Sequence, residues 1–165
     1  MDMIGIISDT HDNKDAIMKI VEILNEMDID LILHAGDHIA PFTVKWMSRF
    51  NAKVVGVAGN NDGEIKLLRK FYEDNGWRFE EFLAEIEYKG RRIALTHGTY
   101  PRVVEALYKS GLYDIVVYGH THEVYIGRYN DTRVINPGEA CGYLTGRRTI
   151  AVYDIDRDEV RIIDL

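Results

Sequence analysis

Short apolar runs alternate with amphipathic segments in the first half of the chain. Residues 3–7, 31–33 and 54–57 are apolar runs of strand length, and each one ends in a polar turn. Between the first two runs, apolar residues recur at helical spacing from Ile17 to Leu24, which predicts a helix over residues 13–27. This alternation of strand and helix is typical of a sheet whose strands run parallel.

The second half has mostly strand patterns, with hairpin turns between them. Lys89-Gly90-Arg91 separates two such runs and indicates a hairpin. Asn136-Pro137-Gly138-Glu139 is a turn signal. The further expected elements are helices over 42–50, 64–75 and 101–110, and strands over 85–88, 92–95, 115–117, 125–129, 133–135, 149–153 and 160–163.

One compact domain accounts for the whole chain. Its 165 residues fall within the usual domain size of about 100–200, and no repeat, low-complexity tract or linker divides residues 1–165. Hydrophobic residues make up 46% and charged residues 28%, as in ordinary globular proteins. Strand–helix alternation followed by hairpins predicts an α/β fold, a four-layer α/β/β/α sandwich of two mixed β-sheets flanked by helices.

The net charge limits which kinds of partner are expected, and the cysteine content indicates the cellular compartment. The net charge of -7 argues against long nucleic acids and anionic membranes as partners, because phosphate groups attract basic surfaces. No apolar run approaches the roughly 20 residues of a membrane span, and the start of the chain lacks the features of a signal peptide. The single cysteine, Cys141, fits a reducing compartment. We therefore expect a cytoplasmic protein.

Polar residues of the types that bind metals follow the apolar runs of both halves. In chain order, these residues are Asp9, His11, Asp37, Asn60, His97, His120 and His122. The carboxyl ends of parallel strands lie on one rim of a sheet, where ligand sites of α/β proteins gather. The pattern therefore predicts that these side chains lie close together.

The chemistry of these residues suits divalent cations. In extended backbone, residues i and i+2 project to the same side, so Asp9 and His11 could reach one cation. A carboxylate has two oxygens, so Asp37 could bridge two cations. Glycine stands beside four of the seven residues and lets the backbone approach closely. Singly, each aspartate or asparagine is an ordinary turn residue, but together the set favours a metal site.

Five motifs resemble, in order, the signature of the calcineurin-like metallophosphoesterases. They are Asp9-x-His11, Gly36-Asp37, Gly59-Asn60, Thr96-His97-Gly98 and Gly119-His120-x-His122. The similarity runs from residue 4 to about residue 138 and is greatest to the small, single-domain YfcE-type members. The resemblance implies a hydrolase that cleaves small phosphate esters, above all a phosphodiesterase.

The resemblance also implies a role for each residue. Asp9, His11 and His122 would hold one divalent cation, Asn60, His97 and His120 the other, and Asp37 would bridge them. Nitrogen and oxygen ligands without thiolate suit Mn, Ni, Co, Fe or Zn. A hydroxide shared by both cations would attack phosphorus in line, so that Asp37, Asn60 and His97 would be catalytic through the metals.

One position departs from the family pattern. Many relatives carry a histidine after the ligand asparagine, and that histidine is thought to protonate the leaving oxygen; this chain has Asn61. An amide cannot act as a general acid near neutral pH, and such catalysis is worth about 10²–10⁴-fold. We therefore expect a preference for esters with acidic leaving groups, or a donor elsewhere, for which His38 is a candidate. Asn61, Tyr100 and Arg102 are candidates for substrate contact, and plain surface solvation is the alternative for the last two.

Two rival functions stay open. A phosphomonoesterase or a nucleotide pyrophosphatase could use the same metals. A retromer-like scaffold protein resembles this fold but has a degraded ligand set, whereas all seven expected ligands are present here. The resemblance is also compatible with a homodimer.

Overall fold

The structure is a computed structural model that describes residues 2–165. Its helices are α1 (Lys14–Glu26), α2 (Thr43–Met47), α3 (Ile65–Asp74) and α4 (Pro101–Lys109). Its strands are β1 (Met3–Ile7), β2 (Leu31–His34), β3 (Lys53–Val57), β4 (Arg78–Glu80), β5 (Leu83–Tyr88), β6 (Arg91–Thr96), β7 (Ile115–Val117), β8 (Val124–Tyr129), β9 (Thr132–Pro137), β10 (Thr149–Asp154) and β11 (Glu159–Asp164).

Both sheets are mixed. The first has six strands in the order β11-β10-β1-β2-β3-β4, and the run from β1 to β4 is parallel. The second has five strands in the order β5-β6-β7-β9-β8, in which β6, β7 and β9 are parallel. Each sheet therefore places three or more strand carboxyl ends along one edge, as the alternating pattern predicts for the first half of the chain.

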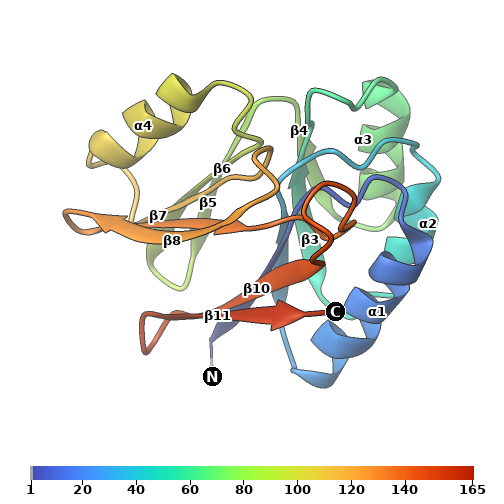
Figure 1. Ribbon diagram of the computed structural model, residues 1–165, viewed down its shortest axis with the longest axis horizontal. Coiled ribbons are helices and arrows are strands. Elements are labelled where there is room, and N and C mark those ends of the chain that lie inside the picture. The colour runs from blue at the N-terminus through green and yellow to red at the C-terminus, as the bar shows by residue number, and fades with distance from the viewer. Residues whose placement is uncertain (1) are drawn as a thin grey trace.

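The two sheets face each other, with helices on both outer sides (Figure 1). Helices α1, α2 and α3 cover the first sheet, and α4 covers the second. Buried residues of both sheets, such as Leu33 and Leu95, form the core between them. The expected four-layer α/β/β/α sandwich is confirmed.

Helix α1 illustrates how local sequence sets these layers. Asn13 caps its N-terminus by accepting a hydrogen bond from the backbone N–H of Ala16 at 3.1 Å. Ile17, Ile20 and Leu24 recur on one face, and all three are buried in the core between α1 and the first sheet. The amphipathic spacing therefore determines which face of the helix meets the sheet.

Two features differ from the sequence-based expectation. Strand β4 was not predicted, because it has only three residues and alternates polar, apolar and polar at Arg78–Glu80. Strand β9 runs on to Pro137, so the first half of the Asn136–Glu139 turn signal belongs to a strand. Proline is tolerated there because β9 pairs with β8 alone at this position, as an edge strand would.

In residues 2–165 the structure contains no helix long and apolar enough to cross a membrane.

Candidate metal centre

The predicted ligands all follow parallel strands. Asp9 comes after β1, Asp37 after β2 and Asn60 after β3 in the first sheet. In the second sheet, His97 follows β6, and His120 and His122 follow β7. The facing edges of the two sheets bring these side chains together into two donor groups.

The first donor group consists of Asp9, His11, His122 and Asp37, whose ligand atoms all lie within 4.8 Å of one another. His122 Nε2 is 3.3 Å from Asp9 Oδ1, and His11 Nε2 is 3.7 Å from the same oxygen. Asp9 Oδ2 is already occupied, since it accepts hydrogen bonds from the Ser8 hydroxyl and the His120 backbone N–H. Its Oδ1 is thus left to face the two imidazoles.

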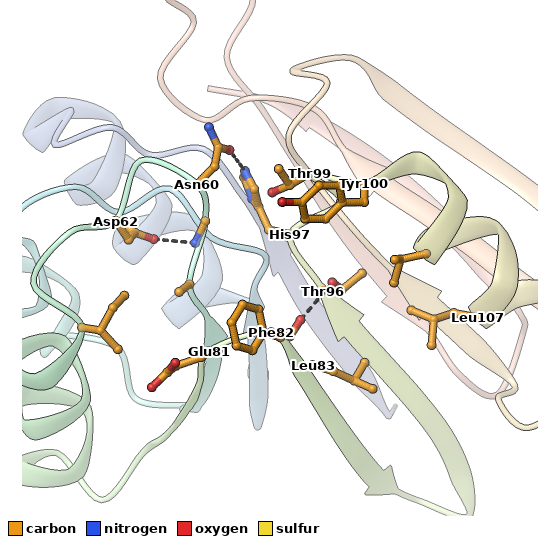
Figure 2. A pocket seen from close by; sticks show the side chains of 15 residues that line it. Asn60, Asp62, Glu81, Phe82, Leu83, Thr96, His97, Thr99, Tyr100 and Leu107 are labelled. Carbon is orange, nitrogen blue, oxygen red and sulfur yellow. Dashed lines mark hydrogen bonds between the residues drawn. The ribbon is translucent and has the colours of Figure 1, made fainter.

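The second donor group consists of Asn60, His97, His120 and Asp37. His97 Nε2 lies 2.9 Å and His120 Nδ1 lies 3.0 Å from Asn60 Oδ1, and the two ring nitrogens are 3.3 Å apart. Figure 2 shows Asn60 directed toward His97. The Nδ1–H of His97 donates to the Ala35 carbonyl at 2.6 Å, which leaves the lone pair on Nε2 for a cation.

Asp37 is common to both groups through a single atom. Its Oδ2 is 3.4 Å from His11 Nε2 and 3.4 Å from His97 Nε2. The backbone N–H and side-chain amide of Asn61 donate to the two Asp37 oxygens at 2.9 and 2.8 Å and fix the carboxylate in place. One oxygen therefore lies between the two sets of ligands.

The donor atoms fit divalent cations. Asp9 Oδ1 and His11 Nε2 are buried, and neither has a hydrogen-bond partner. Buried polar atoms without partners are rare in proteins, and a metal ion is one reason for their presence. Carboxylate oxygens, an amide oxygen and imidazole nitrogens are ligands that transition metals accept.

The backbone at the ligands differs from the expected extended conformation. Asp9 and His11 have φ values of 52° and 41°, in the left-handed region, so alternation along a strand is not what aligns them. His120 and His122 repeat the pattern with φ values of 67° and 63°. Left-handed residues other than glycine cluster at functional sites because the surrounding structure must hold them there.

Two glycines allow the close approach that the motifs predict. A Cβ at Gly59 would lie 2.0 Å from Asp37 Oδ1, and a Cβ at Gly119 would lie 1.9 Å from Ser8 Oγ and 2.8 Å from Asp9 Oδ2. Any side chain at either position would displace a ligand carboxylate or its partner. Only glycine therefore fits at these two positions while the ligand carboxylates keep their places.

The two carboxylates shift the pKa values of the neighbouring groups. The nearby carboxylates of Asp37 and Asp9 raise the pKa of His11 to about 9. Burial disfavours the charged form of Asp37, yet the imidazoles of His11 and His97 beside it outweigh this effect and hold the pKa of this carboxyl well below its usual range. Burial likewise opposes protonation of His97, but the Asp37 carboxylate raises its pKa overall. The metal-free site therefore attracts positive charge.

Residues 3–158 match the family model of the calcineurin-like phosphoesterase superfamily domain. The chain belongs to this family. A phosphodiesterase of Methanocaldococcus jannaschii is 42% identical over 163 residues, covering 98% of each chain. The solved structure of an archaeal phosphodiesterase has a TM-score of 0.96 at 41% identity and covers 99% of both chains.

More distant structures share the fold alone. YfcE, a phosphoesterase from E. coli, has a TM-score of 0.70 at 18% identity over 98% of each chain. Vps29 from Chaetomium thermophilum has a TM-score of 0.74 at 17% identity, covering 100% of this chain and 97% of its own. The family model and the 42% identical relative, and not these distant structures, identify the protein as a phosphoesterase of the calcineurin-like family and a hydrolase.

The remaining candidate residues of this phosphoesterase lie in different surroundings. Asn61 is part of the site through its contacts with Asp37. Tyr100 is 71% exposed and lines a cavity that begins at His97. Arg102 points into solvent, 91% exposed, and pairs with Glu105 at 2.7 Å, which matches the surface alternative.

His38 needs a correction, because its location is incompatible with donating a proton to a substrate. The ring is fully buried, and its Nδ1 donates to Asp62 at 3.2 Å while its Nε2 lies 2.7 Å from the Tyr72 hydroxyl. Asp62 in turn accepts hydrogen bonds from the backbone N–H groups of Asp37 and Gly59 at 3.0 and 2.8 Å. His38 therefore supports the loops that carry Asp37 and Asn60 instead of touching a reacting group.

Glu139 was not among the predicted site residues, and it supports His122. Its fully buried carboxylate accepts a hydrogen bond from His122 Nδ1, and it also accepts the backbone N–H of Thr145 at 2.7 Å. Burial would raise the pKa of Glu139, but these hydrogen bonds outweigh it and lower the pKa to about 2. A signal was present, since Glu139 follows β9, the parallel neighbour of β7.

The Glu139→Gln substitution tests this support. We expect metal affinity to fall by about 10–100-fold, because the partner of a ligating histidine orients the ring and raises its basicity. Calorimetric titration of the metal-free protein with Mn would measure the change. Glu87→Gln, on the exposed face of β5, is the matched control. Equal Mn affinities of the two variants would show that Glu139 does not support metal binding.

Proton release provides a second test. In metal-free protein near pH 7, His11 carries a proton because its pKa is about 9, and a cation requires the neutral imidazole. Metal binding should therefore expel a proton from His11 at about pH 7, and the release should decline as the pH rises through the His11 pKa. Calorimetry in buffers of different ionisation enthalpy measures the number released. His11→Asn should release fewer protons than wild type, and an equal number would contradict the assignment.

Proposed function

We propose that this protein is a two-metal phosphodiesterase that hydrolyses small phosphodiesters. Asp9, His11 and His122 would hold one cation, Asn60, His97 and His120 the other, and Asp37 would bridge them. The single observation that carries this proposal is the equal 3.4 Å separation of Asp37 Oδ2 from His11 Nε2 and His97 Nε2. A carboxylate that only paired with one histidine would have no reason to face both.

The metals that suit this donor set are Mn, Ni, Co, Fe or Zn, because imidazole nitrogens favour them over Mg or Ca alone. When bound, such cations lower the pKa of water and offset the negative charge of the phosphate oxygens. The chain's own residues orient the ligands. Ala35 and Glu139 accept the Nδ1–H groups of His97 and His122, so that both rings present Nε2 to the centre.

The preference for diesters rests on a relative and on Asn61. The Methanocaldococcus jannaschii relative is a phosphodiesterase at 42% identity over 98% of each chain. Asn61 provides an amide beside Asp37 where a proton donor would otherwise stand, and His38 is enclosed by its partners. Substrates whose leaving oxygen needs no protonation should therefore be favoured.

Other readings have less support. A phosphomonoesterase or pyrophosphatase would use the same donors, so it is an outcome of the test below. A scaffold role would not require the complete ligand set that converges here. A homodimer and a cytoplasmic location stay predictions, as does substrate contact by Tyr100.

The test of this proposal compares a diester with its monoester under controlled metal content. Stripped of metal by a chelator, the protein should not hydrolyse bis(4-nitrophenyl) phosphate, and Mn, Ni, Co or Zn should restore the reaction. The diester should be cleaved faster than 4-nitrophenyl phosphate. Asp37→Asn should lose at least about 10²-fold in kcat, because it removes charge between the cations.

Asp131→Asn, at an exposed turn, is the matched control and should retain wild-type activity. Full activity of the chelated protein, or of Asp37→Asn, would refute a two-metal mechanism. A faster monoester reaction would refute the diester preference while leaving the metal centre intact.

The Asn61→His substitution tests whether the absence of a proton donor at this position limits the reaction. We expect hydrolysis of diesters with poor leaving groups to rise by about tenfold or more, because an imidazole can protonate the leaving oxygen. Substrates with activated leaving groups should change little. The measurement is the slope of log kcat against leaving-group pKa, and an unchanged slope would show that Asn61 does not limit the reaction.

A further inference from the structure

A cavity of about 410 Å³ adjoins the metal centre on the side of Asn60 and His97 (Figure 2). It lies between the first sheet and α4, and the turn between β4 and β5 forms part of its wall. The volume falls within the range of about 300–1,000 Å³ that is typical of small-molecule sites. A phosphate bound by the centre would therefore have this cavity beside it.

Away from the metal centre the lining of this cavity is mostly apolar, and it contains the carboxylates of Asp62 and Glu81 but no lysine or arginine. Leu83, Val103 and Leu107 contribute aliphatic surface. The Asp62 carboxylate faces the loops and is already bonded to three backbone N–H groups and His38. The cavity is thus unsuited to a second phosphate, which argues against a polynucleotide chain continuing through it.

Two aromatic side chains stand at the cavity with most of their surface in water. Phe82 is 80% exposed and Tyr100 is 71% exposed. The Phe82 backbone is nevertheless fixed, because its carbonyl accepts a hydrogen bond from the Thr96 hydroxyl at 2.9 Å. An apolar ring held in water beside an apolar cavity gains burial when a flat ligand covers it.

We propose that this cavity binds an aromatic ester group of the phosphodiester substrate, either an aryl ring or a nucleobase, with Phe82 and Tyr100 against the ring. The inference rests on the proposed function, since the metal centre is what holds the phosphate. A planar neutral group matches the aliphatic walls, the exposed rings and the absence of cationic residues. A methyl or other small ester group would leave the cavity filled with water.

The first experiment varies one ester group at constant leaving group. Three diesters of 4-nitrophenol carry methyl, phenyl or thymidine 5′ as the second group. We expect kcat/KM for the phenyl diester to exceed that for the methyl diester by roughly tenfold or more. The thymidine diester shows whether the cavity accepts a nucleobase or only a simple aryl ring. A kcat/KM comparable to that of the phenyl diester indicates a nucleobase, and a kcat/KM no higher than that of the methyl diester indicates a simple aryl group.

Variants show whether a preference for the phenyl diester comes from binding in the cavity or from the chemical reactivity of the ester itself. The double variant Phe82→Ser/Val103→Gln replaces two exposed side chains, so it should fold normally, and it should reduce the phenyl-to-methyl ratio several-fold. Phe42→Ser, which removes a 51% exposed phenylalanine on another surface, is the matched control and should keep the wild-type ratio.

An unchanged phenyl-to-methyl ratio in the double variant would overturn the proposal. The same result combined with a change in oligomeric mass would assign the cavity to a second copy of the chain. A binding measurement keeps the inference separate from catalysis: phenylphosphonate should bind the zinc-loaded protein roughly tenfold more tightly than methylphosphonate, and the double variant should lose that difference. Failure of all diester hydrolysis with this binding difference intact would refute the proposed function alone.

Discussion

The structure depends on holding carboxylate, amide and imidazole side chains together, with no lysine or arginine paired to Asp9 or Asp37 in residues 2–165. Asp37 Oδ2 faces two imidazole nitrogens at 3.4 Å each, and Asp9 Oδ1 is buried without a hydrogen-bond partner. The unpartnered Asp9 oxygen costs free energy in the metal-free protein, because buried polar atoms are normally paired. Bound cations would remove this cost, so metal affinity and folding should be coupled.

The fold meets this constraint by placing strand ends from two sheets on facing edges. Neither sheet alone could complete the site, since Asp9, Asp37 and Asn60 come from one and the three remaining histidines after β6 and β7 from the other. The core between the sheets therefore does more than stabilise the fold, because it sets the distance between the two halves of the centre. Asp62 and Glu139 then position the loops on each side.

The motifs were sufficient to predict the layers and the convergence of the seven side chains because they reflect strong local signals. Apolar runs ending in aspartate or histidine define both a strand and the side chain at its end. What the pattern could not show was how the backbone turns at those ends. Asp9 and His11 adopt left-handed conformations that only tertiary contacts can hold, so the expected extended geometry was wrong.

The residues that were not predicted from the sequence were missed for a different reason. Glu139 and Asp62 act through hydrogen bonds to residues distant in the chain, and no local pattern reveals such partners. Strand β4 is too short to show alternation, yet the segment that follows it, with Phe82, forms a wall of the cavity. The cavity wall thus comes partly from the segment with the weakest sequence signal, while the proposed metal centre uses the segments with the strongest.

Anomalous diffraction from crystals grown with manganese would test whether Asp37 joins two cations. We expect two peaks about 3.5–4 Å apart, one on each side of Asp37 Oδ2, with the other six ligands divided between them. A single peak, or two peaks that do not share Asp37, would contradict it.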